Sequence, residues 1–226
     1  MDETLVVANG IGRDFPDGNA GRITVLRDVD CAISSGARIA LVGPSGSGKS
    51  TLLHILGGLD RPTSGRIEWP SLGSFEELRP RQIGFVFQSP SLFPALTAGQ
   101  NVGLPMILAG ERDAADRTSA LLLDAFGLAE LADKLPEELS GGQAQRIAMA
   151  RALAIGPKLI LADEPTGQLD STTAQFFFDT VLNRLENTGI ALVVATHDDA
   201  IAARMATRWT MDHGWLRSGP YRSKAT

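Results

Sequence analysis

A glycine-rich segment between an apolar strand and an apolar helix restricts the fold of this chain more than any other feature. The segment runs from Gly43 to Ser50 and reads Gly-Pro-Ser-Gly-Ser-Gly-Lys-Ser. Its glycines let the backbone curl so that N–H groups point at phosphate oxygens, and the following helix adds the positive end of its dipole. An ordinary Gly/Ser turn can share this composition, but the flanking strand and helix are the context that a phosphate loop requires. The sequence therefore predicts a nucleotide site on a strand–loop–helix unit.

The side chains at the end of this segment suit a nucleoside triphosphate. Lys49 can reach the β- and γ-phosphates, and the Ser50 hydroxyl can ligate Mg²⁺. The residues that we expect to bind the nucleotide here are Gly43, Pro44, Ser45, Gly46, Ser47, Gly48, Lys49, Ser50 and Thr51.

Strands and helices alternate over much of the chain, which predicts a parallel sheet covered by helices on both faces. We expect strands at 5–8, 25–33, 38–42, 83–87, 159–162 and 190–195, and helices at 49–56, 143–154, 172–185 and 199–205. Residues 61–65 read as a turn, residues 208–217 as a hairpin around His213 and Gly214, and the tail after Gly219 as loose. Residues 96–135 favour helix, so the stretch 89–153 is expected to be a helical subdomain inserted into the sheet.

Two acidic residues follow the apolar strand 159–162. The carboxyl ends of parallel strands are where α/β folds bind ligands, so Asp163 and Glu164 are expected at such an edge. Asp163 can hold Mg²⁺ through its water shell, and Glu164 can take a proton from an attacking water. Two solvated acids at a strand end are common in isolation. Beside a phosphate loop they favour a catalytic role.

Two further polar residues stand at strand ends. Gln88 follows Phe85-Val86-Phe87 and can touch the metal or the attacking water, or it can be a plain loop residue. His197 follows an apolar strand and can hydrogen-bond the γ-phosphate, although a lone histidine is usually structural. His54 and His213 are given no role.

A second glycine-rich segment, Ser140-Gly141-Gly142-Gln143, opens a helix. Ser140 is a good N-cap residue, and two glycines leave bare N–H groups for an anion. A simply capped helix has the same pattern, but the longer string Leu-Ser-Gly-Gly-Gln-Ala-Gln-Arg is much more specific.

Composition limits the class of protein. The net charge of −5 argues against binding of nucleic acid through phosphate contacts. Cys31 is the single cysteine of the sequence, which excludes an internal disulfide and fits a cytosolic setting.

The N-terminus lacks the basic start and apolar run of a signal peptide, and the longest apolar stretches fall far short of the roughly 20 residues of a membrane span. If the protein works at a membrane, another subunit must cross it.

Taken together and in this order, the motifs resemble the nucleotide-binding subunits of ATP-binding cassette (ABC) transporters over nearly the whole chain. The resemblance implies an α/β P-loop NTPase fold with a mostly parallel core sheet, an N-terminal antiparallel β subdomain and an inserted helical subdomain. It implies one ABC ATPase domain over residues 1–226, with about 1–88 and 154–226 as catalytic core and about 89–153 as the helical subdomain. ATP and Mg²⁺ are the implied ligands.

The resemblance also implies a role for each motif. Gly43–Ser50 resembles the Walker A loop, and Phe15 resembles the aromatic residue that stacks on adenine, where the family often has tyrosine. The implied metal ligands are Ser50, Gln88 and Asp163. In the same way, Glu164 resembles the catalytic glutamate, Gln88 the Q-loop glutamine and His197 the switch histidine.

In this family two cassettes pack head to tail, and the signature of one closes on the ATP held by the other. The residues that resemble the signature and are expected to contact ATP in trans are Ser140, Gly141, Gly142 and Gln143. The string Gly-Gln-Leu-Asp at 167–170 resembles the D-loop and includes Asp170. A homodimer of ATPase subunits is therefore expected.

Segments 52–65, 83–88 and 96–102 resemble the lipoprotein-release and macrolide-efflux branch of the family. That branch implies a bacterial subunit on the cytoplasmic face of the membrane, and a permease with a large extracytoplasmic domain that is contacted near Pro90–Val102. Three departures stand out: Gln100 replaces the usual glutamate, Gln168 replaces an asparagine, and residues 69–81 are shorter than usual. They bear on the identity of the partner more than on catalysis.

Two other functions share some of these motifs. A non-transport ATPase that works with a permease-like protein in cell division or envelope regulation would share all of them. A soluble cassette that acts on nucleic acid or ribosomes commonly has two fused cassettes or long coiled-coil insertions, and a basic face. This chain has one cassette, a short helical insert and a net negative charge, so we rank the soluble cassette last.

Overall fold

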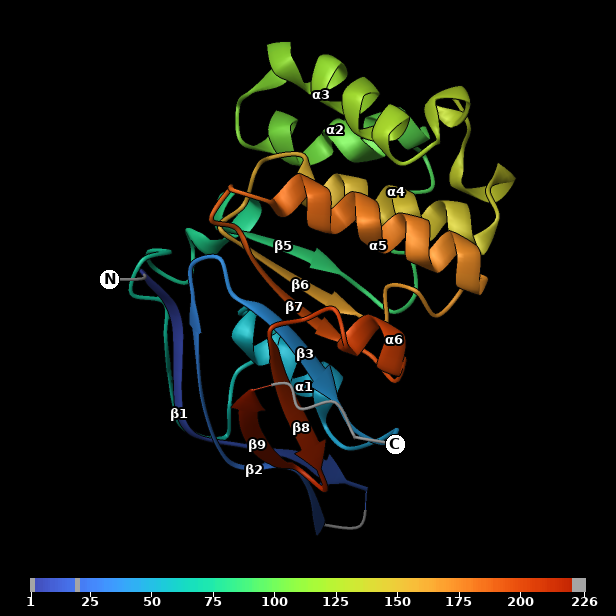
Figure 1. Cartoon of the computed structure of the whole chain (residues 1–226). Coiled ribbons are helices and arrows are strands. Elements are labelled where there is room, and N and C mark those ends of the chain that lie inside the picture. Colours follow the sequence, from blue (N-terminus) through green and yellow to red (C-terminus); the bar gives the residue numbers. More distant parts are fainter. Residues whose placement is uncertain (1–2, 19–20, 221–226) are drawn as a thin grey trace. The chain divides into compact units, whose positions relative to one another are not determined.

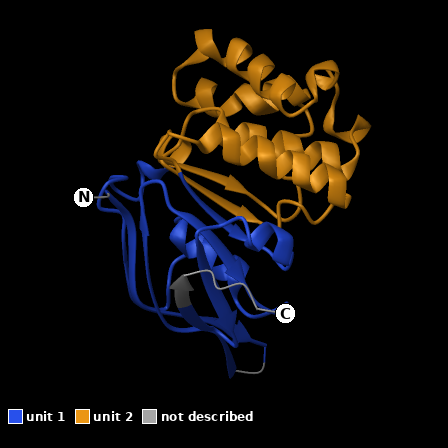
Figure 2. Ribbon diagram, in the orientation of Figure 1, with its two compact units in different colours: residues 1–78, 191–226 blue, residues 79–190 orange. Residues whose placement is uncertain are grey.

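The strands and helices of this chain gather into two units, which Figure 2 colours separately. The structure is a computed structural model, and it describes residues 3–18 and 21–220. The first unit comprises Met1–Leu78 and Ala191–Thr226, and the second Arg79–Ile190. The tail expected to be loose lies, from residue 221 on, outside the described residues. The predicted division into a catalytic core and a helical subdomain at 89–153 stays a prediction.

The first unit begins with an antiparallel sheet in the strand order β2-β1-β4 (Figure 1). Strand β1 runs over Thr4–Asp17, β2 over Gly21–Ser34 and β4 over Ser64–Glu68. The first strand is far longer than the four residues that the sequence predicts, because it continues past Gly10 and Gly12 through a series of register shifts. Such bulges let a strand continue where its alternating pattern is broken.

The same unit holds a second sheet in the order β7-β3-β8-β9. Strands β3 (Arg38–Val42), β7 (Ala191–Ala195) and β8 (Thr207–Asp212) are parallel, and β9 (Trp215–Pro220) returns antiparallel to β8. All of β7 is buried and apolar, as is typical of a parallel strand covered on both faces. Helix α1 (Lys49–Leu56) follows β3, and the short α6 (Asp199–Ala202) follows β7.

The second unit combines two parallel strands with a layered set of helices (Figure 1). Strand β5 (Ile83–Val86) pairs with β6 (Leu159–Asp163). Helix α4 contacts both β5 and α2, so it lies between the strands and the outer pair α2–α3. The helices span Ala98–Leu108 (α2), Arg112–Ala125 (α3), Gly141–Leu153 (α4) and Ser171–Leu185 (α5), and the short helical segments span Leu78–Gln82 (η1), Ala129–Leu131 (η2) and Pro136–Glu138 (η3).

The expected α/β fold is confirmed, with parallel strands in the core and an antiparallel N-terminal sheet. The stretch 96–135, which was expected to favour helix, contains α2 and α3, and the chain turns between them at Gly110, whose φ is +83°. Cys31 lies half-buried in β2, and burial raises the pKa of its thiol to about 12, with a smaller contribution from Asp30. No helix among residues 3–18 and 21–220 is long and apolar enough to cross a membrane.

Candidate functional site

The phosphate loop predicted at Gly43–Ser50 joins β3 to α1 in the first unit. Gly48 is the N-cap of α1, with a φ of +105° and no side-chain hydrogen bond to the helix. Because L side chains rarely adopt this backbone conformation, glycine is required here. The first N–H groups of α1 are therefore left to whatever ligand the loop binds.

Strand β2 and the β8–β9 hairpin hold the loop in place. A Cβ atom at Gly48 would lie 2.9 Å from both the Val25 carbonyl oxygen and a Leu26 methyl group, and one at Gly43 would fall on the Met211 carbonyl oxygen. The carbonyl of Ser47 accepts the Gly214 N–H at 3.1 Å. The loop is thus packed between β2 and the β8–β9 hairpin, with no room for larger residues at these two glycines.

The buried side chains of the loop fit an anionic ligand. Lys49 is almost fully buried, and its Nζ donates to the carbonyls of Gly43 at 2.9 Å and Pro44 at 3.1 Å, so it spans the loop. Ser47 is 3% exposed, and its buried hydroxyl has no hydrogen-bond partner among the described residues. A buried hydroxyl without a partner is costly, so a phosphate oxygen inside the loop would complete its hydrogen bonding. Pro44, Ser45 and Gly46 are exposed and form the mouth of the loop. Ser50 and Thr51, which follow Lys49 in the first turn of α1, are half-buried.

His197 lies at the edge of the sheet where this loop begins. Strands β3 and β7 are parallel, with Leu41 beside Ala195, and the Thr196 N–H donates to the Leu41 carbonyl at 3.0 Å. His197 follows Thr196 and is exposed. The structure therefore brings His197 and the phosphate loop to the same edge of the first unit's parallel strands.

In the second unit, Gln88, Asp163 and Glu164 come to one edge of the β5–β6 pair. Val86 lies beside Ala162, so the residues that follow both strands emerge together. Asp163 is 4% exposed, and its Oδ1 atom has no hydrogen-bond partner within the described part of the chain. A buried carboxylate oxygen in this condition suits a cation and its water shell, which fits the expected Mg²⁺.

Glu164 has an unusual backbone. Its φ is +47°, in the left-handed region, where residues other than glycine, asparagine and aspartate are uncommon. Its carbonyl accepts the Gly167 N–H at 3.1 Å, which holds the turn after β6. Strained conformations of this kind cluster at functional sites, so the observation agrees with a catalytic role for Glu164.

Gln145 is a residue of this edge that the sequence reasoning missed. It is fully buried in α4, and its Nε2 donates to the Phe87 carbonyl at 3.1 Å, directly before Gln88. The available signal was a polar residue on a helix face that continues with the apolar residues Ala148, Met149 and Ala152. Gln145 ties the start of the Q-loop segment to the helix that begins at the signature.

The signature segment Ser140–Gln143 starts α4. The Ser140 hydroxyl accepts the Gln143 N–H at 3.2 Å, and the Gln143 side chain accepts the Ser140 N–H at 2.8 Å, which together form a capping box. Cβ atoms at Gly141 and Gly142 would collide with the side chains of Gln168 and Leu169. The two glycines therefore make room for the D-loop.

A cavity of about 290 Å³ lies between the signature and the D-loop within the second unit. Ser140, Gly142 and Asp170 line it, and so does Arg146, whose Nη1 donates to the Phe126 carbonyl at 3.0 Å. Burial lowers the pKa of Arg146, and the charge of Asp170 acts in the opposite direction. Asp170 itself caps α5, and hydrogen bonds from Thr173 hold its pKa below the usual value.

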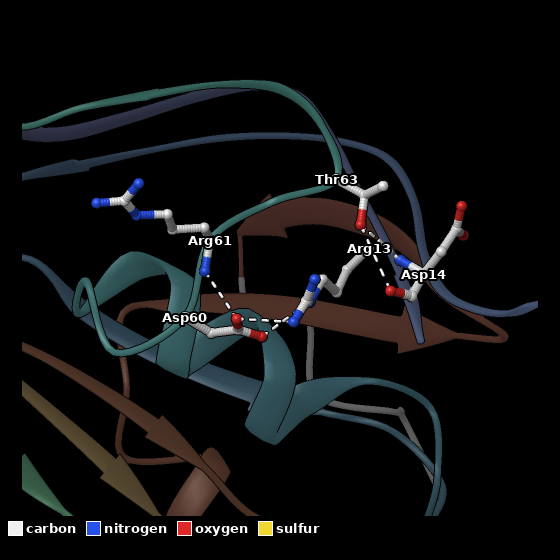
Figure 3. A network of polar contacts seen from close by, with 5 residues as sticks. All are labelled: Arg13, Asp14, Asp60, Arg61 and Thr63. Atoms are coloured by element: carbon white, nitrogen blue, oxygen red, sulfur yellow. Dashed lines mark hydrogen bonds and ion pairs between the residues drawn. The ribbon is translucent and has the colours of Figure 1, made fainter. Parts of the chain in front are cut away.

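Phe15, the expected adenine platform, lies half-buried in β1 beneath Arg13. The guanidinium carbon of Arg13 is 4.4 Å from the centroid of the Phe15 ring. Asp60 binds the same guanidinium group (Figure 3). The sequence reasoning missed both Arg13 and Asp60, because 47 residues separate them and nothing local links them.

The segment expected to meet a permease, Pro90–Val102, is held by one buried amide. Asn101 accepts the Phe93 N–H and donates to the carbonyls of Phe93, Leu96 and Thr97 at 2.8–3.1 Å. Phe93 itself is 53% exposed. Gln100 completes a capping box with Thr97, a role that glutamine and glutamate share, so its departure from the branch pattern leaves the helix start intact.

Comparisons with known proteins agree on one family. The family model described as "ABC transporter" matches residues 26–167. The lipoprotein-releasing system ATP-binding protein LolD of Legionella pneumophila (strain Paris) is 44% identical over 225 residues, which cover 96% of this chain and 98% of that protein. The protein of the same name from Shewanella oneidensis is 39% identical, with coverage of 96% and 97%.

Solved structures give the same result. The dimeric, post-hydrolysis state of the ATP-binding cassette MJ0796, bound to ADP and phosphate, has a TM-score of 0.88 and 35% identity to this chain. The similarity covers 97% of this chain and all of that one.

Proposed function

Because this chain belongs to the ABC transporter family and is an ATP-hydrolysing subunit of that family, we propose that it powers the release of lipoproteins from a membrane through a separate permease. The observation that carries this proposal is the similarity to LolD proteins over the full length of both chains. These relatives are named for a lipoprotein-releasing system. Macrolides or peptides are the alternative cargoes of the branch.

The phosphate loop binds ATP in this proposal. Backbone N–H groups of Gly43–Ser50 and the N-terminus of α1 surround the β- and γ-phosphates, and Lys49 turns from the loop carbonyls to the phosphates. Ser47 donates its unpartnered hydroxyl to the same anion. Phe15 supplies an aromatic face for adenine.

Ser50 and Asp163, with Gln88, are the residues that would hold Mg²⁺, which when bound neutralises charge that develops on the transferred phosphoryl group. Glu164 takes the proton of the attacking water, and His197 hydrogen-bonds the γ-phosphate and responds to its loss. The left-handed backbone at Glu164 fixes the direction in which its carboxylate leaves the strand.

Hydrolysis is a property of the dimer in this proposal. The capped start of α4 presents Ser140, Gly141 and Gly142 to ATP held by the partner subunit, and Asp170 stands at the same interface. The related cassette MJ0796 was solved as a dimer with ADP and phosphate, which supports this arrangement. Since the signature would contact the γ-phosphate in the closed dimer alone, ATP binding closes the dimer and hydrolysis opens it.

The permease contact is proposed at Pro90–Val102, on the cytoplasmic face of the membrane. The exposed side chain of Phe93 offers an apolar contact for a permease with a large extracytoplasmic domain. Its backbone N–H donates to the buried Asn101 side chain, which fixes its position.

Replacement of the base tests the assigned chemistry. Glu164→Gln keeps the size of the side chain and cannot accept the proton, so turnover should fall about 10²–10⁴-fold while ATP still binds and traps a dimer. Phosphate release and size-exclusion chromatography with ATP measure the two effects. Normal turnover in this variant would show that Glu164 is not the base.

The partner and the cargo are tested by purification from membranes. Tagged chain should recover a multi-span protein from detergent-solubilised membranes, and the complex in proteoliposomes should release an acylated lipoprotein with ATP but not in the Glu164→Gln form. Recovery of no multi-span protein would favour a soluble cassette. A complex that extrudes a macrolide and leaves the lipoprotein in place would refute lipoprotein release.

A further inference from the structure

Arg13 lies between an aromatic ring and a carboxylate. Its guanidinium carbon is 4.4 Å from the Phe15 ring centroid. Its Nε and Nη2 donate to the two carboxylate oxygens of Asp60 at 2.9 and 2.8 Å (Figure 3). The side chains of Arg13 and Asp60 are 24% and 27% exposed, so solvent screens the pair in part. Two parallel hydrogen bonds fix the plane of a guanidinium group as a single bond cannot.

Asp60 is attached to the C-terminal end of α1. The N–H groups of Leu59 and Asp60 both donate to the His54 carbonyl, at 2.7 and 3.2 Å. The Asp60 carboxylate also accepts the Arg61 N–H at 2.8 Å (Figure 3). The phosphate loop therefore leads into the first residue of α1, and Asp60, the partner of Arg13, follows the last turn of the same helix.

The β1 side of the contact is equally well held. Thr63 donates its N–H to the Gly12 carbonyl at 2.8 Å, and its hydroxyl accepts the Asp14 N–H at 3.0 Å, so the loop after α1 binds β1 on both sides of Arg13. Leu26, the cross-strand neighbour of Arg13, packs against Gly48 of the phosphate loop. Phe15 is thus in β1, which pairs with the strand that packs against the loop.

We propose that Arg13 and Asp60 form a clamp that positions Phe15 as the platform for the nucleobase, an inference that rests on the proposed stacking of Phe15 on adenine. The guanidinium covers one face of the ring, so the base would stack on the other. A ring that is already fixed loses less conformational freedom when the base stacks on it, which strengthens binding. Through Asp60, α1 sets the position of the platform relative to the phosphate loop at its other end.

The clamp is tested by separating the base from the phosphates. Isothermal titration with ATP and with inorganic tripolyphosphate is carried out on Arg13→Gln, Asp60→Asn and Phe15→Ala. Phe15→Ala should weaken ATP binding about tenfold. Each clamp variant should weaken it about three- to tenfold and leave tripolyphosphate affinity within about twofold, as expected for a lost contribution to stacking alone. Arg22→Gln is the matched control. Arg22 lies in the same hairpin, and its Nη1 is 3.9 Å from the Asp14 Oδ2, so this variant should bind both ligands as the wild type does.

A double-mutant cycle distinguishes the possible outcomes. Asp60→Asn added to Phe15→Ala should cause no further loss if the clamp acts through the ring. Wild-type ATP affinity in both clamp variants, together with a loss in Phe15→Ala, would overturn the clamp and keep the platform. Wild-type affinity in Phe15→Ala would overturn the platform itself. Equal loss of ATP and tripolyphosphate in the clamp variants would show that the pair supports the phosphate loop instead, and would also overturn the inference.

Discussion

The two glycine-rich helix starts of this chain use their glycines for different purposes. At the phosphate loop, Gly48 adopts a φ of +105° and α1 begins without a side-chain cap, so its backbone N–H groups are available. At the signature, Gly141 and Gly142 are ordinary helical residues, and α4 is capped by its own Ser140. One segment needs glycine for conformation, whereas the other needs it for clearance from Gln168 and Leu169.

This difference indicates which segment can bind an anion by itself. A cage of backbone N–H groups around a buried lysine is complete within one chain, apart from the ligand. A helix that already uses a serine side chain to satisfy one of its first N–H groups offers fewer free donors. We therefore expect the phosphate loop to set affinity in the isolated subunit, and the signature to act after a second subunit arrives.

The largest expected effect separates binding from turnover. Lys49→Ala should lower the ATP affinity of the isolated chain about 100-fold or more, since a buried cation is removed from its anion. Ser140→Arg should leave that affinity within about twofold and lower turnover at least about 100-fold, because the bulky cation blocks the approach of a partner's ATP. Titration calorimetry and phosphate release measure the two quantities. Loss of ATP binding in Ser140→Arg would show that the signature belongs to the site of its own chain.

The next effect compares the two kinds of glycine. Gly48→Ala places a Cβ against the Val25 carbonyl in a left-handed backbone, so it should destabilise the fold by about 1–3 kcal/mol and reduce ATP affinity. Gly141→Ala needs a shift of the Gln168 side-chain end alone and gains helix propensity, so its free energy of unfolding should change by less than about 1 kcal/mol. Chemical denaturation of both variants measures this. Equal destabilisation would remove the distinction between conformation and clearance.

A smaller effect concerns the cap. Ser140→Ala removes the hydroxyl that accepts the Gln143 N–H, so the fold should lose about 1 kcal/mol, or roughly 2–4 °C in Tm. Ser140→Thr keeps a hydroxyl and is the control. An unchanged Tm in the alanine variant would mean that the cap contributes nothing, and the signature would then resemble the phosphate loop in this respect.

The smallest effect is a dependence on pH at the D-loop. The Thr173 hydrogen bonds hold the pKa of Asp170 below its usual value, so this carboxylate stabilises the fold above its unfolded pKa and loses that contribution as pH falls through its folded pKa. Asp170→Asn should make the thermal stability less dependent on pH on this acidic side. Thermal unfolding from neutral pH down to strongly acidic pH would detect the change. A variant with the acid dependence of the wild type would show that other carboxylates account for it.

Local sequence predicted the parts of this molecule that depend on local chemistry. Helix α1 begins at Lys49 and ends at Leu56 as expected, because a glycine loop precedes it and Gly57 follows it. Strands β3, β5, β6 and β7 were found within one or two residues, since buried parallel strands are continuous apolar runs. The motif residues could be named for the same reason, although their roles in catalysis stay predictions.

The features that sequence reasoning missed depend on tertiary contacts. Strand β4 was taken for the end of a turn, because its charged and glycine residues are stabilised by pairing with β1 rather than by burial. The bulges that extend β1 beyond Ala8 leave no periodic pattern. The Arg13–Asp60 pair and the contact of Gln145 with Phe87 join residues 47 and 58 positions apart, and no local signal specifies such partners.

The hydrogen bond between Ser47 and Gly214 has a consequence for the synthesis of the protein. The phosphate loop leaves the ribosome early, but the hairpin turn that packs against it is made 164 residues after Ser50, on the order of ten seconds later at typical rates of translation. Until then the loop lacks the Met211 and Gly214 contacts that hold its shape. A nascent chain that ends before this hairpin should therefore be unable to use ATP as a folding ligand, so nucleotide can stabilise the newly made subunit only after the hairpin has been synthesised.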